Sequence, residues 1–183
     1  NMELLNKQSV GFVGSRTVNE DDIDFTKSTV SKTLQNGFGV VTGGAKGIDT
    51  VAAQAALDNN GFVIEYLADS MMQKMRKADI VKSINRGNLL LLSASIPTAG
   101  FNVGFAMMRN KYIYSQSDAT IVIKTDKNKG GTWNGAIENL KKGWCTEYCR
   151  NIEYSGNLEL IKMGAIPIDE NWSGVITKIE FDK

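Results

Sequence analysis

Short apolar runs alternate with longer amphipathic stretches along almost the whole chain. The runs are too short for helices and are typical of strands buried on both faces. The stretches between them carry apolar residues at helical spacing, as Ile23, Thr26 and Val30 do, and Asn36-Gly37 is a helix-stop signal. Because strands that alternate with helices are joined by right-handed crossovers, this pattern constrains the chain to a mostly parallel sheet with helices on both faces.

Each predicted element follows from the same pattern. The predicted strands span 10–13, 38–41, 61–67, 88–94, 119–123 and 144–149. The predicted helices span 21–35, 47–59, 70–85, 100–116, 130–143 and 157–165, with an apolar triplet at 166–168 and a weak strand around 175–181. No linker rich in Pro or Ser divides the chain. We therefore predict an α/β fold, a single Rossmann-like domain over residues 2–183, in which residues 150–183 form a C-terminal tail packed on the same domain.

Charge and hydropathy exclude several classes of protein. The 183 residues carry a formal net charge of +1, so a nucleic-acid site would need a local concentration of positive charge. No apolar run approaches the roughly 18 residues that a membrane-spanning helix requires, and the N-terminus does not have the pattern of a signal peptide. We expect a cytoplasmic protein with no membrane partner.

The cysteines and the missing histidines limit the available chemistry. Cys145 and Cys149 are the only cysteines, and the chain has no His, which makes a poor zinc site. We expect two reduced structural thiols and no metal. Without His, Ser-His-Asp and Cys-His catalysis are excluded, so acid–base work would fall to Asp, Glu, Lys or Tyr.

Small residues and cations follow four of the predicted strands. The segments are Gly14 to Arg16, Gly43 to Gly47, Ser93 to Gly104 and Lys129 to Thr132. Open parallel sheets bind ligands beyond the carboxyl ends of their strands, where glycines let backbone N–H groups approach an anion. The second segment is neither a dinucleotide fingerprint nor a P-loop, and a glycine turn can be purely structural. Four such segments on one edge nevertheless favour a phosphate-binding crevice.

Two other features have both a structural and a functional interpretation. Arg109-Asn110-Lys111 lies late in a predicted helix, where the cations can form a solvated face. The apolar residues of that helix are candidates for the core: Phe101, Phe105, Met108 and Tyr112. Asp49 lies in the first turn of its predicted helix, where capping or compensation of the helix dipole is the simpler explanation.

The ordered set of motifs resembles the DNA-processing protein A (DprA, or Smf) family. The motifs are GSR, TGGAKGID, FNVGFAMMRNKYIYSQSDATIVI, KGGTWNGAIENLKKG and GNLELIKMGAIPI, and they extend from about Val10 to Ile168. The resemblance implies a Rossmann-like domain that binds single-stranded DNA, protects incoming strands in natural transformation and helps to load a RecA-type recombinase. It also implies a homodimer, no cofactor and no turnover chemistry.

The resemblance implies a basic pocket for DNA phosphates, lined by backbone donors and a hydroxyl. Together with the edge segments above, it gives this predicted site: Gly14, Ser15, Arg16, Gly43, Gly44, Ala45, Lys46, Gly47, Arg109, Asn110, Lys111, Lys129, Gly130, Gly131 and Thr132.

A second resemblance leaves two alternatives open. MMRNK, DATIVI and GGTWNGAIE are also similar to the lysine-decarboxylase-like (LOG) nucleoside-monophosphate phosphoribohydrolases. That resemblance implies an N-glycosidic hydrolase with Arg109 and Glu138 as catalytic residues, although Thr132 follows Gly131 directly and breaks the expected Gly-x-Gly-Thr spacing. The other alternative is a non-catalytic module that senses a small nucleotide on the same scaffold.

Overall fold

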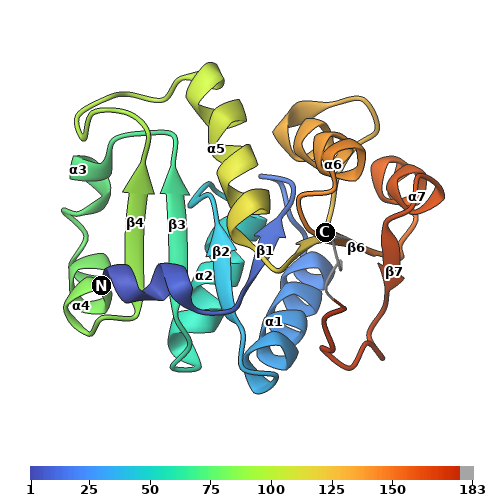
Figure 1. The fold of residues 1–183 in the computed structure, drawn as a ribbon, viewed down its shortest axis with the longest axis horizontal. Coiled ribbons are helices and arrows are strands. Elements are labelled where there is room, and N and C mark those ends of the chain that lie inside the picture. The colour runs from blue at the N-terminus through green and yellow to red at the C-terminus, as the bar shows by residue number, and fades with distance from the viewer. Residues whose placement is uncertain (178–183) are drawn as a thin grey trace, which may run out of the picture.

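Seven parallel strands form one sheet in the order β4-β3-β2-β1-β5-β6-β7 (Figure 1). The structure is a computed structural model that describes residues 1–177. The strands are β1 (Ser9–Val13), β2 (Gly39–Thr42), β3 (Val63–Leu67), β4 (Leu89–Ser93), β5 (Ala119–Val122), β6 (Thr146–Arg150) and β7 (Ile166–Ile168). The chain winds from β1 toward β4 on one side and from β5 toward β7 on the other, so the winding reverses between β1 and β5.

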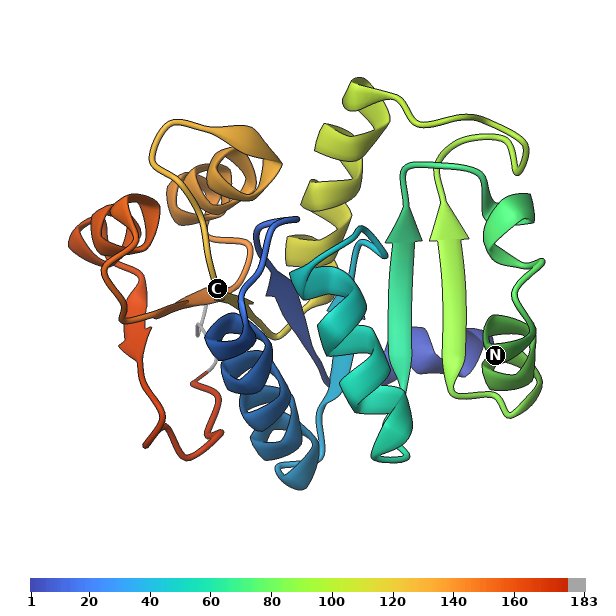
Figure 2. The same ribbon diagram turned by 180° about the vertical axis from the view of Figure 1, so that it is seen from behind.

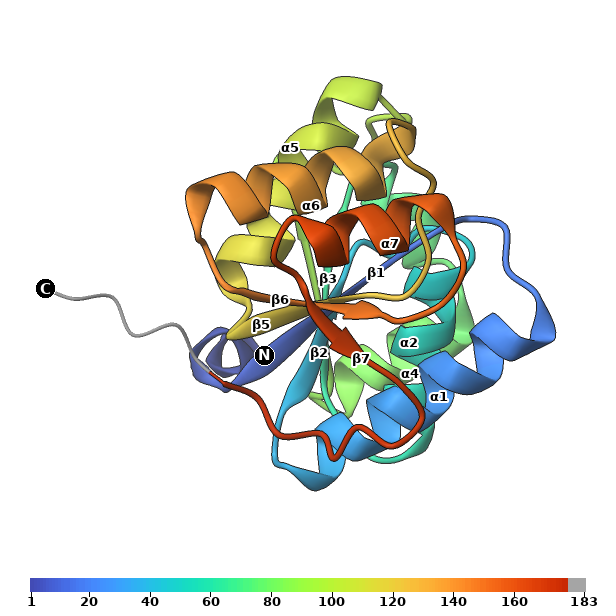
Figure 3. The ribbon, with the colours of Figure 1, turned by 90° about the vertical axis from the view of Figure 1, so that its right-hand side faces the viewer.

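Helices cover both faces of the sheet. They are the 3-10 helix η1 (Met2–Asn6) and the α-helices α1 (Glu20–Gln35), α2 (Ile48–Asp58), α3 (Met71–Lys74), α4 (Ala78–Asn85), α5 (Val103–Gln116), α6 (Gly130–Lys142) and α7 (Ser155–Lys162). Figure 3 shows α5, α6 and α7 on one face and α1, α2 and α4 on the other, and Figure 2 shows α1 and α2 in front of the strands. Within residues 1–177, no helix is long and apolar enough to cross a membrane.

Each face of the sheet packs against its own apolar core. Val10 and Phe12 of β1 contact the core beneath α1 and α2, whereas Val13 belongs to the core beneath α5 and α6. All five residues of β1 are buried, as expected for a central strand covered on both faces. At about 25 cal/mol for each Å² of apolar surface removed from water, these two cores are the main stabilising contribution to the fold.

The structure confirms the predicted fold class and corrects one element. A single helix was expected over 70–85, but α3 ends at Lys74 and α4 begins at Ala78. Lys74 forms an ion pair with buried Glu65 of β3, while Ile80 packs against the core under the sheet. On one continuous helix these two side chains would point about 120° apart, so the helix breaks.

The C-terminal part adds to the same sheet. The triplet at 166–168 forms β7 beside β6, with Tyr148 opposite Ile166. Residues 175–177 form no strand, and the rest of the weak strand expected around 175–181 lies outside the described residues.

Candidate functional site

A cavity of about 410 Å³ opens where the winding of the sheet reverses, beyond the carboxyl ends of β1 and β5. We call it the crevice. Four segments supply most of its lining: the loop after β1, the end of β5, the first turn of α6, and α5. Four basic side chains line it against two acidic ones: Arg16, Arg109, Lys124 and Lys129, with Asp49 and Asp126. The local charge is therefore positive although the whole chain is nearly neutral.

The N-terminus of α6 opens into the crevice without a side-chain cap. Lys129 is the N-cap residue, and among residues 1–177 no side-chain cap accepts a hydrogen bond from the amides at this end of α6, and the first turn contains no acidic residue. Gly130 has φ +82°, a conformation that favours glycine. Thr132 Oγ1 donates to the Gly14 carbonyl at 3.1 Å, and Asn110 Nδ2 donates to the Gly131 carbonyl at 3.0 Å. These contacts fix an uncapped, partly positive helix end that suits a phosphate.

The loop after β1 contributes a cationic side chain to the crevice rather than free backbone donors. The Ser15 amide donates to the Lys124 carbonyl at 2.9 Å, and the Ser15 carbonyl accepts the Ile48 amide at 3.2 Å. Arg16 is exposed, and its Cζ lies 5.2 Å from the centre of the Phe101 ring. This cation–π contact holds the guanidinium over the crevice at little cost in solvation.

A second cavity of about 770 Å³ lies beyond β2 and β3, and we call it the side cavity. It shares four residues with the crevice: Arg16, Ala45, Phe101 and Arg109. Five basic side chains line it against three acidic ones: Arg16, Lys46, Lys74, Lys77 and Arg109, with Glu65, Asp69 and Asp79. The two cavities therefore form one mixed but positive surface along the carboxyl edge.

Arg109 lies beneath the second glycine turn, where the two cavities meet. Its residue exposure is only 8 %, and a methyl group on Gly43 would overlap its guanidinium. Its Nη1 lies 3.6 Å from Asp49 Oδ2 and donates to the Tyr66 carbonyl at 3.4 Å. Asp49 Oδ2 also accepts the Ala45 amide at 3.3 Å. Burial raises the pKa of Asp49 to about 6, against the opposing effect of Arg109.

Most of the predicted site residues meet at this edge. Ten line the crevice: Gly14, Ser15, Arg16, Ala45, Arg109, Asn110, Lys129, Gly130, Gly131 and Thr132. Three more line only the side cavity: Gly43, Gly44 and Lys46.

Two predicted residues, Gly47 and Lys111, line neither cavity. Gly47 has φ +79° and packs against the Ser15 carbonyl, so its role is to let the loops after β1 and β2 approach each other. Lys111 Nζ forms an ion pair with Glu138 at 3.0 Å on the surface of α5 and α6. Glu138 also lies outside both linings, so Arg109 and Glu138 do not share a cavity as the hydrolase alternative requires.

Among the crevice residues that sequence reasoning missed are Lys124, Thr125 and Asp126. They follow directly after β5, and the rule that selected Arg16 after β1 would have found them. The expected core residues of α5 also need correction: Phe101, Met108 and Tyr112 are exposed. The N-terminal half of α5 projects beyond the sheet (Figure 1), and Ile113 is the first apolar residue of α5 that is buried.

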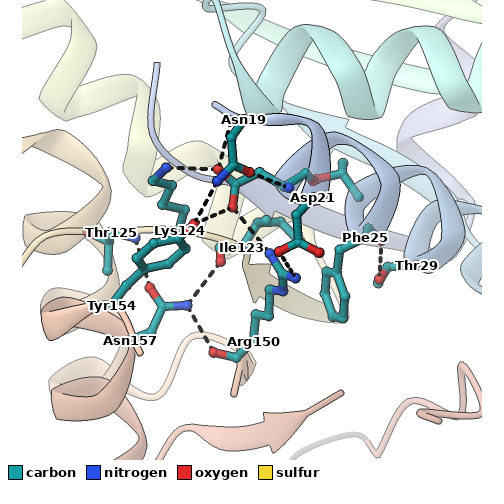
Figure 4. Close-up of polar contacts among 12 residues, drawn as sticks. Asn19, Asp21, Phe25, Thr29, Ile123, Lys124, Thr125, Arg150, Tyr154 and Asn157 are labelled. Carbon is teal, nitrogen blue, oxygen red and sulfur yellow. Dashed lines mark hydrogen bonds and ion pairs between the residues drawn. The ribbon is translucent and has the colours of Figure 1, made fainter. Parts of the chain in front are cut away.

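A buried ionic network supports the crevice from the α1 side (Figure 4). The fully buried Asp22 carboxylate accepts Lys124 Nζ at 2.8 Å, Tyr154 Oη at 3.0 Å and Arg150 Nη1 at 3.2 Å. Burial opposes ionisation, but hydrogen bonds from Lys124, the Asn19 amide and Tyr154 lower the pKa of Asp22 overall. The network fixes Lys124, whose carbonyl in turn holds Ser15.

The cysteines are structural, as expected. Cys145 and Cys149 are free and buried, and burial raises the pKa of the Cys145 thiol to about 12, which makes it a poor nucleophile. Residues 1–177 contain no group of three or more His, Cys, Asp or Glu side chains placed to hold a metal ion.

The sheet order and the cation-lined crevice define a Rossmann-like protein with a positively charged cavity at its topological switch point. The model of the DNA recombination-mediator protein A family matches residues 1–179, and the chain belongs to this family. Comparison with curated protein sequences gives no significant match.

Two solved structures of DNA processing protein A resemble the chain. The Streptococcus pneumoniae protein aligns with a TM-score of 0.80 and 25% identity over 92% of this chain and 60% of its own. The Helicobacter pylori protein, described for its single-stranded DNA binding mode, aligns with a TM-score of 0.76 and 23% identity over 91% of this chain and 78% of its own. The chain thus spans less than two thirds of the pneumococcal protein.

The fold also occurs in proteins with a different ligand. The molybdenum cofactor binding protein of Rippkaea orientalis aligns with a TM-score of 0.63 and 16% identity over 89% of this chain and 90% of its own. At this identity the likeness concerns the fold alone.

Proposed function

We propose that this chain binds single-stranded DNA in the crevice, mainly through the phosphates of the strand. The observation that carries the proposal is the uncapped N-terminus of α6, which lies with its N-cap residue Lys129 and with Arg16 in the lining of one cavity at the switch point of the sheet. Membership of the DNA recombination-mediator protein A family and the single-stranded DNA binding mode of the Helicobacter pylori relative support the choice of ligand.

The two cavities give the strand a path along the carboxyl edge. One phosphate lies against the first turn of α6, between Lys129 and Arg16, and a neighbouring one lies toward Lys46 in the side cavity. Because these contacts go to the backbone of the strand, binding depends on salt and little on base sequence. Binding of this kind requires no bond to be made or broken in the DNA.

Charge-removal variants inside and outside the crevice test the site. Arg16→Ala and Lys129→Ala should each weaken the affinity for a labelled oligo-dT and lower the slope of log affinity against log salt by about 0.7. Lys142→Ala is the matched control, because Lys142 is exposed in the last turn of α6, away from the crevice. Equal effects of all three substitutions would contradict a localised site.

The nucleotide hydrolase is the weaker proposal, since Arg109 and Glu138 line no common cavity. If it holds, the protein releases free base from a nucleoside monophosphate and Glu138→Gln abolishes the release. A nucleotide-sensing module would instead bind a free nucleotide and would not bind oligo-dT.

The finer roles that family membership suggests stay proposals. These are loading of a RecA-type recombinase, a homodimer and a cytoplasmic location. The exposed apolar side chains of Met108 and Tyr112 on α5 offer the homodimer a candidate surface. Light scattering of the wild-type protein and of Met108→Glu measures whether this surface joins two copies.

A further inference from the structure

The second glycine turn already contains an anion that belongs to the chain. The Asp49 carboxylate accepts the Ala45 amide at 3.3 Å and lies 3.6 Å from Arg109 Nη1. The Gly43 amide also faces it. We call these groups, the amides of Gly43 and Ala45 with the Arg109 guanidinium, the anion seat. Ala45, Asp49 and Arg109 all line the crevice, so the seat opens to the cavity that the DNA strand is proposed to occupy.

Arg109 is not fully satisfied by Asp49. Its side chain is 90 % buried, since 10 % of it is exposed. Among the hydrogen bonds of residues 1–177, its Nε finds no acceptor, and its contacts to Asp49 and to the Tyr66 carbonyl are long. A buried guanidinium with an unused donor and long contacts to its partners retains the capacity to bind a further oxyanion. The anion seat therefore combines a buried cationic side chain with the partial positive charge of the α2 N-terminus.

We propose that Asp49 is an internal competitor of phosphate: its carboxylate neutralises the Arg109 guanidinium at the anion seat, and the seat attracts a phosphate-type oxyanion to its crevice side when Asp49 is neutral. The proposal rests on the proposed function for the identity of the anion as a DNA phosphate. It predicts that oxyanion affinity rises as the pH falls. Conversely, a bound oxyanion holds Asp49 in its protonated form.

The groups around Asp49 decide the sign of this effect. Arg109 and Tyr114 face it from α5, Glu65 from β3, and the outer charges are Arg16, Asp69 and Lys74. The chain has no His, so none of these groups has an unperturbed pKa between 5 and 8. Burial brings the pKa of Asp49 to about 6, so Asp49 titrates within that range. Its protonation leaves the Arg109 charge uncompensated toward the cavity.

The size of the effect follows from the fraction of protein with neutral Asp49. If the seat accepts an oxyanion only in that form and the pKa is about 6, the apparent affinity falls about 30-fold between pH 5.0 and pH 7.5. Asp49→Asn keeps the shape of the side chain without its charge. This variant should bind at pH 7.5 about as tightly as the wild type does at pH 5.0.

The experiment measures the affinity for labelled oligo-dT at pH 5.0 and 7.5 in the wild type, Asp49→Asn and Asp69→Asn. Asp69→Asn is the matched control because it removes the same charge from the exposed rim of the side cavity without touching the Ala45 amide. The proposal predicts a loss of pH dependence in Asp49→Asn alone. Wild-type pH dependence in Asp49→Asn, or the same change in both variants, overturns it.

A second probe separates this proposal from the DNA proposal. Sulfate is a tetrahedral oxyanion whose charge does not change between pH 5.0 and 7.5. At pH 7.5, sulfate should raise the thermal midpoint of Asp49→Asn more than chloride of equal ionic strength does. This excess of sulfate over chloride should be smaller in the wild type and in Asp69→Asn. If no protein binds oligo-dT but sulfate acts in this way, the DNA function fails and the role of Asp49 holds. No sulfate effect specific to Asp49→Asn overturns the proposal.

Discussion

Removing the Asp22 carboxylate is the most informative perturbation of the framework behind the crevice. Asp22 is fully buried and joins α1 to Lys124 after β5, to Arg150 of β6 and to Tyr154 (Figure 4). Asp22→Ala leaves Arg150, of whose side chain 3 % is exposed, with two outer carboxylate partners, Asp21 and Glu170. Lys124, with 19 % of its side chain exposed, loses its carboxylate partner altogether.

The cost can be worked from these contacts. Breaking a buried ion pair by removing one partner costs about 3–5 kcal/mol, because the remaining charge is buried without compensation. The outer carboxylates of Arg150 offset part of this, so we expect Asp22→Ala to lower the free energy of unfolding by about 3 kcal/mol at pH 7. For a chain of this length, that corresponds to a fall in Tm of about 6–12 °C.

Urea unfolding at pH 7 measures the loss, with Asp21→Ala as the control. Asp21 contacts the same Arg150 at 2.6 Å, but 65 % of its side chain is exposed, so its removal should cost less than about 1 kcal/mol. The pKa of Asp22 in the folded protein is lowered from its ordinary value of 3.8. Ionised Asp22 therefore stabilises the fold above pH 3.8, and this stabilisation is lost as the pH falls through the folded-state pKa. Equal, small losses in the two variants would refute this account of the network.

Two further substitutions test other parts of the structure. Burial raises the pKa of Glu147 to about 8, so the wild-type free energy of unfolding should fall by on the order of 5 kcal/mol as the pH rises from about 4.5 through about 8. Glu147→Gln should flatten that profile in urea unfolding, and an unchanged slope would contradict the assignment. Gly43→Ala should lower the unfolding free energy by about 1–3 kcal/mol, because the new methyl group overlaps the Arg109 guanidinium. Gly100→Ala has open space around it and should change that energy by less than about 0.5 kcal/mol; similar losses in both would exclude the overlap.

The sequence predicted the sheet and its cation-lined edge because both depend on local patterns. Buried apolar runs mark strands, and glycines with cations after them mark the carboxyl edge, which is why Arg16, Lys129 and Gly130 meet in one cavity as expected. The break between α3 and α4 was not predictable in this way. It depends on the contact of Lys74 with Glu65, which comes from a different part of the chain.

The roles of the individual charges also depend on contacts between distant segments. Asp49 and Lys111 both lie on predicted helices. Their neighbours in the sequence do not show that Asp49 is buried and that Lys111 lies on the surface. Packing of α5 across the second glycine turn brings Arg109 to Asp49, whereas Lys111 points away to Glu138. Lys124 would have been found by the strand-end rule, but its restraint by Asp22 requires the folded network.

Titration of the wild-type protein with labelled oligo-dT at two salt concentrations, with free nucleotides as competitors, tests the central claim most directly. Three of the exposed cations at the cavities, Arg16, Lys46 and Lys129, lie along the proposed path of the strand and predict a slope of log affinity against log salt of about −2. The account also predicts that free nucleotides compete weakly. Absence of oligo-dT binding, or a free nucleotide that binds far more tightly than the strand, would contradict it.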